Sequence, residues 1–396
     1  MVKIRQDAFE WIPLEQESLA TIKYIGYTDE KAKDLWEVWE AILNSEEDPD
    51  FLHDILLPPI YDSVNKFADT LNAWDESDDW RGVMKKWGLS KEFQDTIMDP
   101  EFADIRLTES MRAWVSGTMR LRLDTLQCIA KVSELRAEQC VKHVHTCTTS
   151  TNEGSFEIPN VLVCSLEGQL QSRREKNASE TKQSDAEDTT VLYKPIQASQ
   201  VFDIFCRRKD TRYPLTSEDL WYYLHVYYDQ HDTFPADFAN WDNDMGAFYT
   251  SQLLTSKFAR YSARRSRGHS PATVIKMSIP TRALRTNLSI MVLSDEQLWR
   301  KVVWENRVEK DSDEQAFVVD PTPPILHPTL DILIGKISCN KGRAMGKKES
   351  WEKLSAENVL MVDEGKGMEA PMQYCFWGEY WPNKIGVDIH VEKVDL

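Results

Sequence analysis

The spacing of apolar residues changes near the middle of this 396-residue chain, and the change limits the folds that the chain can adopt. Up to about residue 145, apolar residues recur at intervals of three and four, which is the period of amphipathic helices. After about residue 191 they occur in short runs rich in β-branched and aromatic residues, which is typical of strands. We therefore expect an α+β protein with a helical first half and a sheet in its second half.

Three apolar runs predict a helical bundle in the first half. The run at 29–43 places its leucines, isoleucine and tryptophans at helical spacing. A second run, at 52–74, contains Pro58-Pro59, which should break or restart the helix. The longest run begins near Leu107 and presents one apolar face, with Arg120 and Arg122 on other faces.

A polar stretch predicts the boundary between the two halves. Residues 171–190 are charged and lack aromatic side chains, so we expect a disordered linker. The apolar run at 156–166 could form a strand that belongs to either neighbour. The predicted organisation is a helical bundle at 1–146, a partly disordered linker at 147–190 and a second domain at 191–396.

The second half combines short strands with helices. A helix is predicted at 295–307, opened by Ser294 with Gln297 three residues later as a capping box. The predicted strands lie at 191–193, 247–249, 273–277, 290–293, 331–334 and 373–376.

The charge balance makes nucleic acid a poor partner. The formal net charge is -18, from 47 Lys and Arg against 65 Asp and Glu, and such a surface repels phosphate backbones. The exception is a basic cluster made of Arg260, Arg264, Arg265 and Arg267. Two interpretations stay open for it: a solvated loop, or a contact with an anion or pyrophosphate.

The sequence also predicts an intracellular protein. Residues 1–16 lack the apolar core of a signal peptide, and no apolar run approaches the ~18 residues that a membrane span needs. Seven cysteines without a secretion signal suggest reduced thiols, hence the cytoplasm or the nucleus.

Four possible metal ligands occur within eight residues: Cys140, His143, His145 and Cys147. Zinc binds such residue types, but this spacing matches no familiar zinc module. They stand where a helix is expected to end, so helix-end histidines with buried cysteines are the alternative, and we expect no metal. The chain also lacks Gly-x-Ser-x-Gly, phosphate-loop and GxGxxG motifs, which excludes most enzyme classes that have strong local motifs.

Several segments of the second half, taken in order, carry a resemblance to a known family. They are Val191-Leu192-Tyr193-Lys194-Pro195, Asp237-Phe238 with Gly246-Ala247-Phe248-Tyr249-Thr250, Trp299 to Arg307, Leu330 to Lys336, and Gln373-Tyr374-Cys375-Phe376. Together they resemble an uncharacterised family of ADP-ribosyltransferase-like proteins found in fungi and bacteria. The first half is similar to a helical domain of unknown function that fungal members carry.

This resemblance implies a fold, a ligand and a set of site residues. The fold would be two packed, mostly antiparallel sheets with flanking helices, and the ligand would be NAD as a substrate. The implied NAD-binding residues are Tyr193, Lys194, Gly246, Phe248, Tyr249 and Thr250, and the implied catalytic residues are Lys194, Gln373 and Glu379. The Tyr249 ring would stack on nicotinamide beside Gly246, whose missing side chain lets the backbone approach the ligand.

Two of these positions depart from the family pattern. Lys194 stands where the family has His, and Gln373 stands where transferases often place Glu. A glutamine amide can hold a ribose hydroxyl but cannot accept a proton, so Glu379 or Glu369 would have to replace it. Two functions are therefore expected: NAD binding with weak or diverged ADP-ribosyl transfer, or a non-catalytic pseudoenzyme. In the second, the helical domain, which is rich in tryptophan, would bind a protein partner.

Overall fold

The structure is a computed structural model of the chain, and it describes somewhat more than half of the residues. Within helices and strands, the side chains at 61, 132, 135–147, 247–248, 305–307, 388 and 390–393 are outside this description. The predicted strand at 156–166, residues 171–188 of the predicted disordered linker, Gly246 and Glu379 also lie outside it. The last two residues of that linker are not disordered, because they begin a strand, Thr189–Ile196. The described ranges are 12–13, 15–44, 50–61, 79–147, 189–196, 247–268, 273–286, 288–307, 330–339, 350–363, 365, 367–376 and 388–393.

The described part of the first half is helical, as predicted. Several of its helices begin after a short polar residue that caps the first turn; the hydroxyls of Ser18, Thr28 and Ser90 each accept a backbone N–H from three residues later. The long run forms α8, and α3 starts at Pro58 as the proline pair predicts. The helices are α1 (Leu19–Ile25), α2 (Asp29–Leu43), η2 (Phe51–Leu56), α3 (Pro58–Tyr61), α5 (Trp80–Lys86), α6 (Lys91–Ile97), η3 (Pro100–Phe102), α7 (Ala103–Arg106) and α8 (Met111–Cys147).

A glycine sets the sharp turn between α1 and α2. Gly26 ends α1 with a φ of 139°, and a Cβ at this position would lie 2.1 Å from the ring of Phe93. The turn is bonded to the one before α6, because Ser90 donates its N–H to the Gly26 carbonyl and Thr28 donates its N–H to that of Gly88. Only glycine satisfies both the positive φ and the close approach of the ring.

Among the described strands of the second half, seven form a sheet in the order β4-β5-β8-β2-β1-β3-β9. All neighbours pair antiparallel except β4 with β5. The six predicted strands are confirmed, and β9, β6 and β7 are additional. The strands are β1 (Thr189–Ile196), β2 (Ala247–Tyr249), β3 (Thr273–Pro280), β4 (Ile290–Val292), β5 (Ile332–Lys336), β6 (Val362–Asp363), β7 (Met368–Glu369), β8 (Met372–Phe376) and β9 (Asp388–Lys393).

This sheet confirms the α+β class and differs from the implied pair of packed sheets. The described strands form the single large sheet and a separate two-stranded ribbon of β6 and β7. Two longer helices accompany the strands, α12 (Gln252–Arg265) and α14 (Glu296–Arg307), with the short α13 (Thr281–Thr286) after β3. Asp295, not Ser294, caps α14, because its carboxylate accepts the N–H of Leu298 at 2.7 Å.

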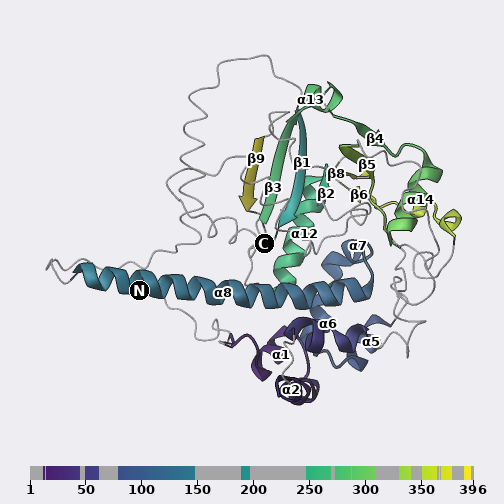
Figure 1. The fold of residues 1–396 in the computed structure, drawn as a ribbon. Coiled ribbons are helices and arrows are strands. Elements are labelled where there is room, and N and C mark those ends of the chain that lie inside the picture. The colour runs from purple at the N-terminus through teal and green to yellow at the C-terminus, as the bar shows by residue number, and fades with distance from the viewer. Residues whose placement is uncertain are drawn as a thin grey trace.

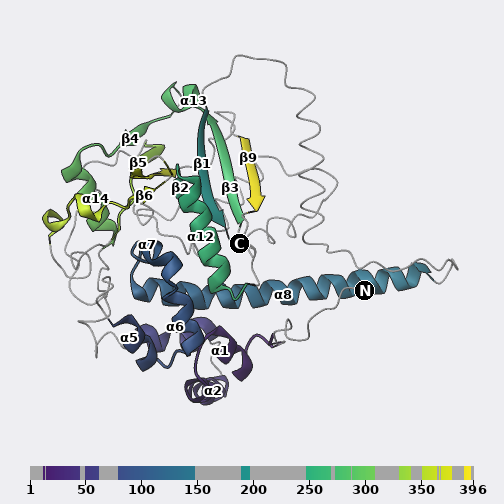
Figure 2. The same ribbon diagram turned by 180° about the vertical axis from the view of Figure 1, so that it is seen from behind.

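Helix α12 connects the two halves of the molecule. Figures 1 and 2 show it running from the sheet to α8, with α1, α2 and α5 on the far side of α8. Tyr249 and Phe258 belong to the same apolar core as Trp114 in α8 and Ile22 in α1. The predicted boundaries at 146 and 191 lie close to the end of α8 and the start of β1, but one core continues across them.

Candidate functional site

Three of the segments that carry the resemblance lie side by side in the sheet. Strands β8, β2 and β1 are consecutive in its order. Tyr249 in β2 is paired with Tyr193 in β1 on one side and with Gln373 in β8 on the other. Directly paired residues share a face of a sheet, so these three side chains form one row across it.

Lys194 does not join this row. Successive residues of a strand point to opposite faces, so Lys194 lies on the face opposite to Tyr193, Tyr249 and Gln373. The lysine is buried and is paired with Ile275 of β3. The expectation that Lys194 and Gln373 act on one nicotinamide together with Tyr249 is therefore not met by the register of the strands.

The row is covered by α12. Tyr249 is only 1% exposed, and its ring stacks on Phe258 of α12 at 5.8 Å between ring centroids, with 30° between the planes. Tyr193 is half-buried, and its hydroxyl donates to Oε1 of Gln252 at 3.4 Å. The resemblance implies that the Tyr249 ring is open to nicotinamide, whereas in the structure a helix packs on that face.

The polar groups of Gln373, in the row, and of Thr250, the residue after Tyr249, are engaged with the backbone. The Thr250 hydroxyl accepts the N–H of Met372 at 3.1 Å, and the Thr250 N–H donates to the Met372 carbonyl at 3.0 Å, which extends the β2–β8 pairing by one residue. Gln373 is fully buried, and its Nε2 donates to the Lys336 carbonyl at 3.4 Å. Both groups therefore join neighbouring strands. Glu369, the alternative carboxylate, is exposed on β7.

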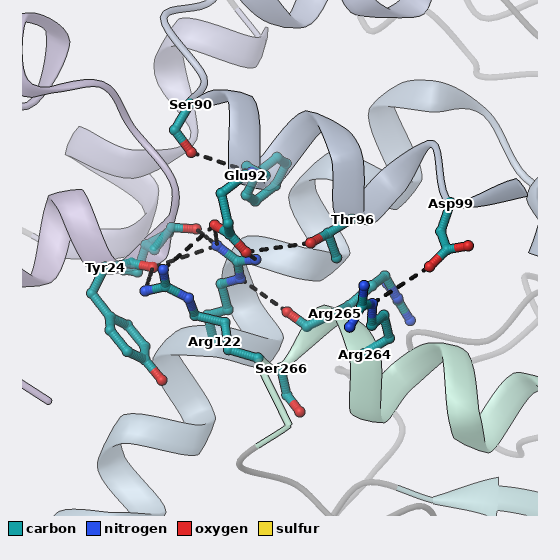
Figure 3. A network of polar contacts seen from close by, with 12 residues as sticks. Tyr24, Ser90, Glu92, Thr96, Asp99, Arg122, Arg264, Arg265 and Ser266 are labelled. Carbon is teal, nitrogen blue, oxygen red and sulfur yellow. Dashed lines mark hydrogen bonds and ion pairs between the residues drawn. The ribbon is translucent and has the colours of Figure 1, made fainter. Parts of the chain in front are cut away.

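The sequence interpretation missed the most extensive polar cluster that the structure describes. It lies where α1, α6 and α12 meet α8, and Figure 3 shows four of its members, Tyr24, Glu92, Arg122 and Arg265. With Arg267, which contacts Tyr24 and Glu92, we call this cluster the arginine junction. Arg122 is completely buried and forms a bidentate ion pair with Glu92 of α6, at 2.8 and 3.1 Å. The same guanidinium donates to the carbonyls of Arg265 at 2.9 Å and Ile25 at 3.2 Å. Arg122 thus satisfies carbonyls at the ends of α1 and α12.

The ion pair changes the titration of both partners. Burial raises the pKa of Glu92, but the adjacent Arg122 and its hydrogen bonds outweigh this, so the pKa of Glu92 is lowered overall. Burial also lowers the pKa of Arg122, which Glu92 partly offsets. Arg267 reinforces the junction, since it donates to the Tyr24 carbonyl, lies over the Tyr24 ring and approaches Glu92 to 3.6 Å.

Arg265 is a second buried cation at this junction. Its guanidinium lies 4.7 Å from the ring of Trp114 and 4.8 Å from that of Tyr261, and its Nη1 donates to the Thr118 hydroxyl at 3.3 Å. Its Nε and Nη2 have no hydrogen-bond partner within the described part of the chain. Burial, with Arg122 nearby, lowers the pKa of Arg265 to about 10. The basic cluster at 260–267 is therefore not a solvated loop.

Ion pairs continue from the junction along α12. They join its residues 257, 260 and 264, spaced on one face, to the segment that precedes α8. The pairs are Lys257–Asp104 at 2.6 Å, Arg260–Glu101 at 3.8 Å and Arg264–Asp99 at 3.4 Å. Tyr261 lies beneath them and donates its hydroxyl to the Ile97 carbonyl at 2.9 Å. These contacts fix α12 against the helical half.

One signal in the sequence indicates this arrangement. Arg122 stands between Leu121 and Leu123, and Leu123 lies outside the apolar face that contains Leu121. An arginine between two apolar positions that point to different sides of a helix can be buried, and it then needs buried partners. The stretch 260–267 likewise alternates arginines with Tyr261 and Ala263.

Comparisons of the chain with family models, curated proteins and solved structures find no match. Across the described residues, no helix combines the length and the apolar character required to span a bilayer. The four possible metal ligands from Cys140 to Cys147 lie within the last turns of α8, not beyond its end, and their side chains are outside the description. Among the side chains that are described, no three His, Cys, Asp or Glu gather as a metal site.

Proposed function

We propose that this chain is a non-catalytic protein-interaction module built on an ADP-ribosyltransferase-like domain. The observation that carries the proposal is the burial of Tyr249 against Phe258, at the position where the resemblance requires an open nicotinamide site. Thr250 and Gln373 support it, because each uses its polar group to join neighbouring strands. A group already bonded inside the core does not stabilise a charge that develops on a substrate.

The chemistry of the substituted positions supports the same conclusion. Glycosidic cleavage of NAD needs polar groups aimed at the ribose from one side. Here Lys194 and Gln373 lie on opposite faces of the sheet, and Gln373 cannot accept a proton. Losing general acid–base help alone slows such a reaction by about 10²–10⁴.

The second candidate function is NAD binding with weak ADP-ribosyl transfer. One observation favours it: three of the segments that carry the resemblance lie on the consecutive strands β1, β2 and β8. NAD would then bind beside Tyr193, Lys194, Gly246, Phe248, Tyr249 and Thr250, with Lys194, Gln373 and Glu379 as the candidate catalytic groups.

Calorimetric titration of the full chain with NAD, combined with an assay for released nicotinamide, separates the two candidates. The interaction module gives no binding heat up to millimolar NAD and no nicotinamide. The proposal would be contradicted if NAD bound with a dissociation constant below about 1 mM, and if Lys194→Ala weakened this binding while the matched Thr190→Ala on the same strand did not. That result would support NAD binding with ADP-ribosyl transfer.

A further inference from the structure

Arg265 is buried near the end of α12, and one side of its guanidinium has no partner in the described part of the chain. The residue is 0% exposed, and its Nη1 donates to the Thr118 hydroxyl at 3.3 Å. Its Nε and Nη2 find no acceptor among the described residues. Leaving a buried donor unpaired is costly, and more so on a charged group, so this arrangement needs an explanation.

The two unpaired nitrogens form one edge of the guanidinium. In this planar group the N–H bonds of Nε and Nη2 point in the same direction, which is the geometry that holds an anion through two parallel hydrogen bonds. Nη1, the nitrogen that donates to Thr118, lies on the other side of the group. Arg265 therefore keeps a complete anion-binding edge unoccupied by the described side chains.

Arg122, the other buried arginine of the arginine junction, shows the contrast. Its Nε donates to the Arg265 carbonyl, and Nη1 and Nη2 donate to the Glu92 carboxylate, which Figure 3 shows directed at this guanidinium. Arg122 is also 0% exposed, yet each of its three nitrogens has an acceptor. The fold thus satisfies one buried arginine and leaves the other incomplete.

The hydroxyls beside Arg265 are engaged as donors elsewhere. The Thr118 hydroxyl donates to the Trp114 carbonyl at 2.6 Å, and the Tyr261 hydroxyl donates to the Ile97 carbonyl at 2.9 Å. The rings of Trp114 and Tyr261 lie against the guanidinium and stabilise a cation, but they bring no negative charge.

The arginine junction also carries more positive than negative charge. It contains three arginines, at 122, 265 and 267, against the single carboxylate of Glu92, which already pairs with Arg122 and approaches Arg267 to 3.6 Å. With a pKa of about 10, Arg265 is protonated at neutral pH. A buried charge is normally paired, and none of the described carboxylates pairs with this one.

Ser262 adds a third unpaired group three residues before Arg265. Residues at this spacing are neighbours on the surface of a helix. Ser262 is 2% exposed, and its Oγ likewise has no partner within the described chain. A buried helical hydroxyl commonly donates to the carbonyl four residues earlier, as that of Thr255 does to Ser251. The Ser262 hydroxyl is instead left available on the buried side of α12.

We propose that a chloride-sized inorganic anion binds at the Nε–Nη2 edge of Arg265, with the Ser262 hydroxyl as a third donor. The ion offsets part of the excess positive charge and stabilises the contact between α12 and α8. A phosphate or a nucleotide is too large for groups that are completely buried and needs more donors than these three. A water molecule supplies no negative charge. The site goes beyond the proposed function and does not depend on it, because no strand of the sheet contributes to it.

Urea unfolding of the full chain tests the site when chloride replaces gluconate at constant ionic strength, since gluconate is too large for a buried site. An ion that binds only the folded protein raises the folding equilibrium constant in proportion to its concentration, above its dissociation constant. We expect this constant to rise about tenfold for a tenfold rise in chloride for the wild type.

Three variants assign the effect to the proposed groups. Arg265→Met removes the anion-binding edge and should reduce the rise to less than about twofold. The matched control, Arg264→Met, removes the adjacent exposed arginine that pairs with Asp99 and should keep the tenfold rise. Ser262→Ala should shift the rise to higher chloride concentrations, because one of the three donors is lost.

Crystals of the full chain grown in bromide give a second readout, and an anomalous peak is expected in contact with Nε and Nη2 of Arg265. The inference would be overturned by a wild type that is insensitive to chloride, by equal sensitivity in Arg265→Met, or by a water without anomalous signal at this edge. If Arg265→Met does not fold, the bromide crystals decide, because a missing peak refutes the site.

Discussion

Substituting Glu92 by Gln tests whether the arginine junction holds the helical half together. Arg122 is fully buried, whereas the Glu92 side chain is 45% exposed, so their bidentate pair lies between a buried and a surface ion pair. Removing one partner of a fully buried pair costs about 3–5 kcal/mol, and exposed pairs contribute about 0–1 kcal/mol. Arg122 keeps its carbonyl partners at Ile25 and Arg265 in the variant. We therefore expect Glu92→Gln to lower the free energy of unfolding by about 2 kcal/mol.

A double-mutant cycle with Arg122→Met isolates the interaction, with urea unfolding as the assay. The predicted coupling energy is about 1.5–2 kcal/mol. The control cycle is Arg81→Met with Asp95→Asn, a pair at 2.5 Å in which both side chains are about half exposed, and it should give less than about 0.5 kcal/mol. Equal coupling in the two cycles would refute the reasoning, because it would mean that burial of Arg122 adds nothing.

Other consequences concern pH and the core. Because the pKa of Glu92 is lowered in the folded protein, its carboxylate stabilises the fold at any pH above the ordinary glutamate pKa of about 4.3, and this stabilisation is lost as the pH falls through the folded-state pKa. The difference in urea midpoint between wild type and Glu92→Gln should therefore shrink from pH 6 to pH 3. Burial raises the pKa of Tyr261 to about 12, so stability should fall as the pH rises above about 10, and the ultraviolet titration of this tyrosinate should coincide with unfolding. Tyr249→Ala should cost about 3–5 kcal/mol in the same urea assay, whereas a value below about 1 kcal/mol would place the ring at a surface.

The sequence predicted where many helices and strands occur, but it predicted much less about which faces of these elements pack against one another. The period of the apolar residues predicted α2 and α8, and runs of β-branched and aromatic residues predicted β1, β2, β3, β4, β5 and β8. The side on which Lys194 lies could not be predicted, because a shift of one residue in strand register moves every side chain to the other face. In the structure Tyr193, and not Lys194, is paired with Tyr249, and this register places Lys194 on the face opposite to Tyr249.

The burial of Arg122 and Arg265 could also not be predicted from the residues that neighbour them in the sequence. A charged side chain is normally placed at the surface, and only its long-range partners make burial possible. The partners of Arg122 come from α1, α6 and α12, as far as 143 positions away in the sequence, and Arg265 donates to Thr118 of α8, 147 positions away. Tyr249 is buried because α12 packs on the sheet. The spacing of Leu254 and Phe258 predicts an apolar side on α12, but it does not specify what that side packs against.

The most direct measurement is the free energy of unfolding of the full chain with and without millimolar NAD. A ligand that binds only the folded protein raises this free energy by about 2.7 kcal/mol when present at one hundred times its dissociation constant. Because the Tyr249 ring packs on Phe258 inside the core, we predict the same value in both solutions. A rise of more than about 1 kcal/mol that disappears in Lys194→Ala would contradict the closed site and restore the nucleotide pocket.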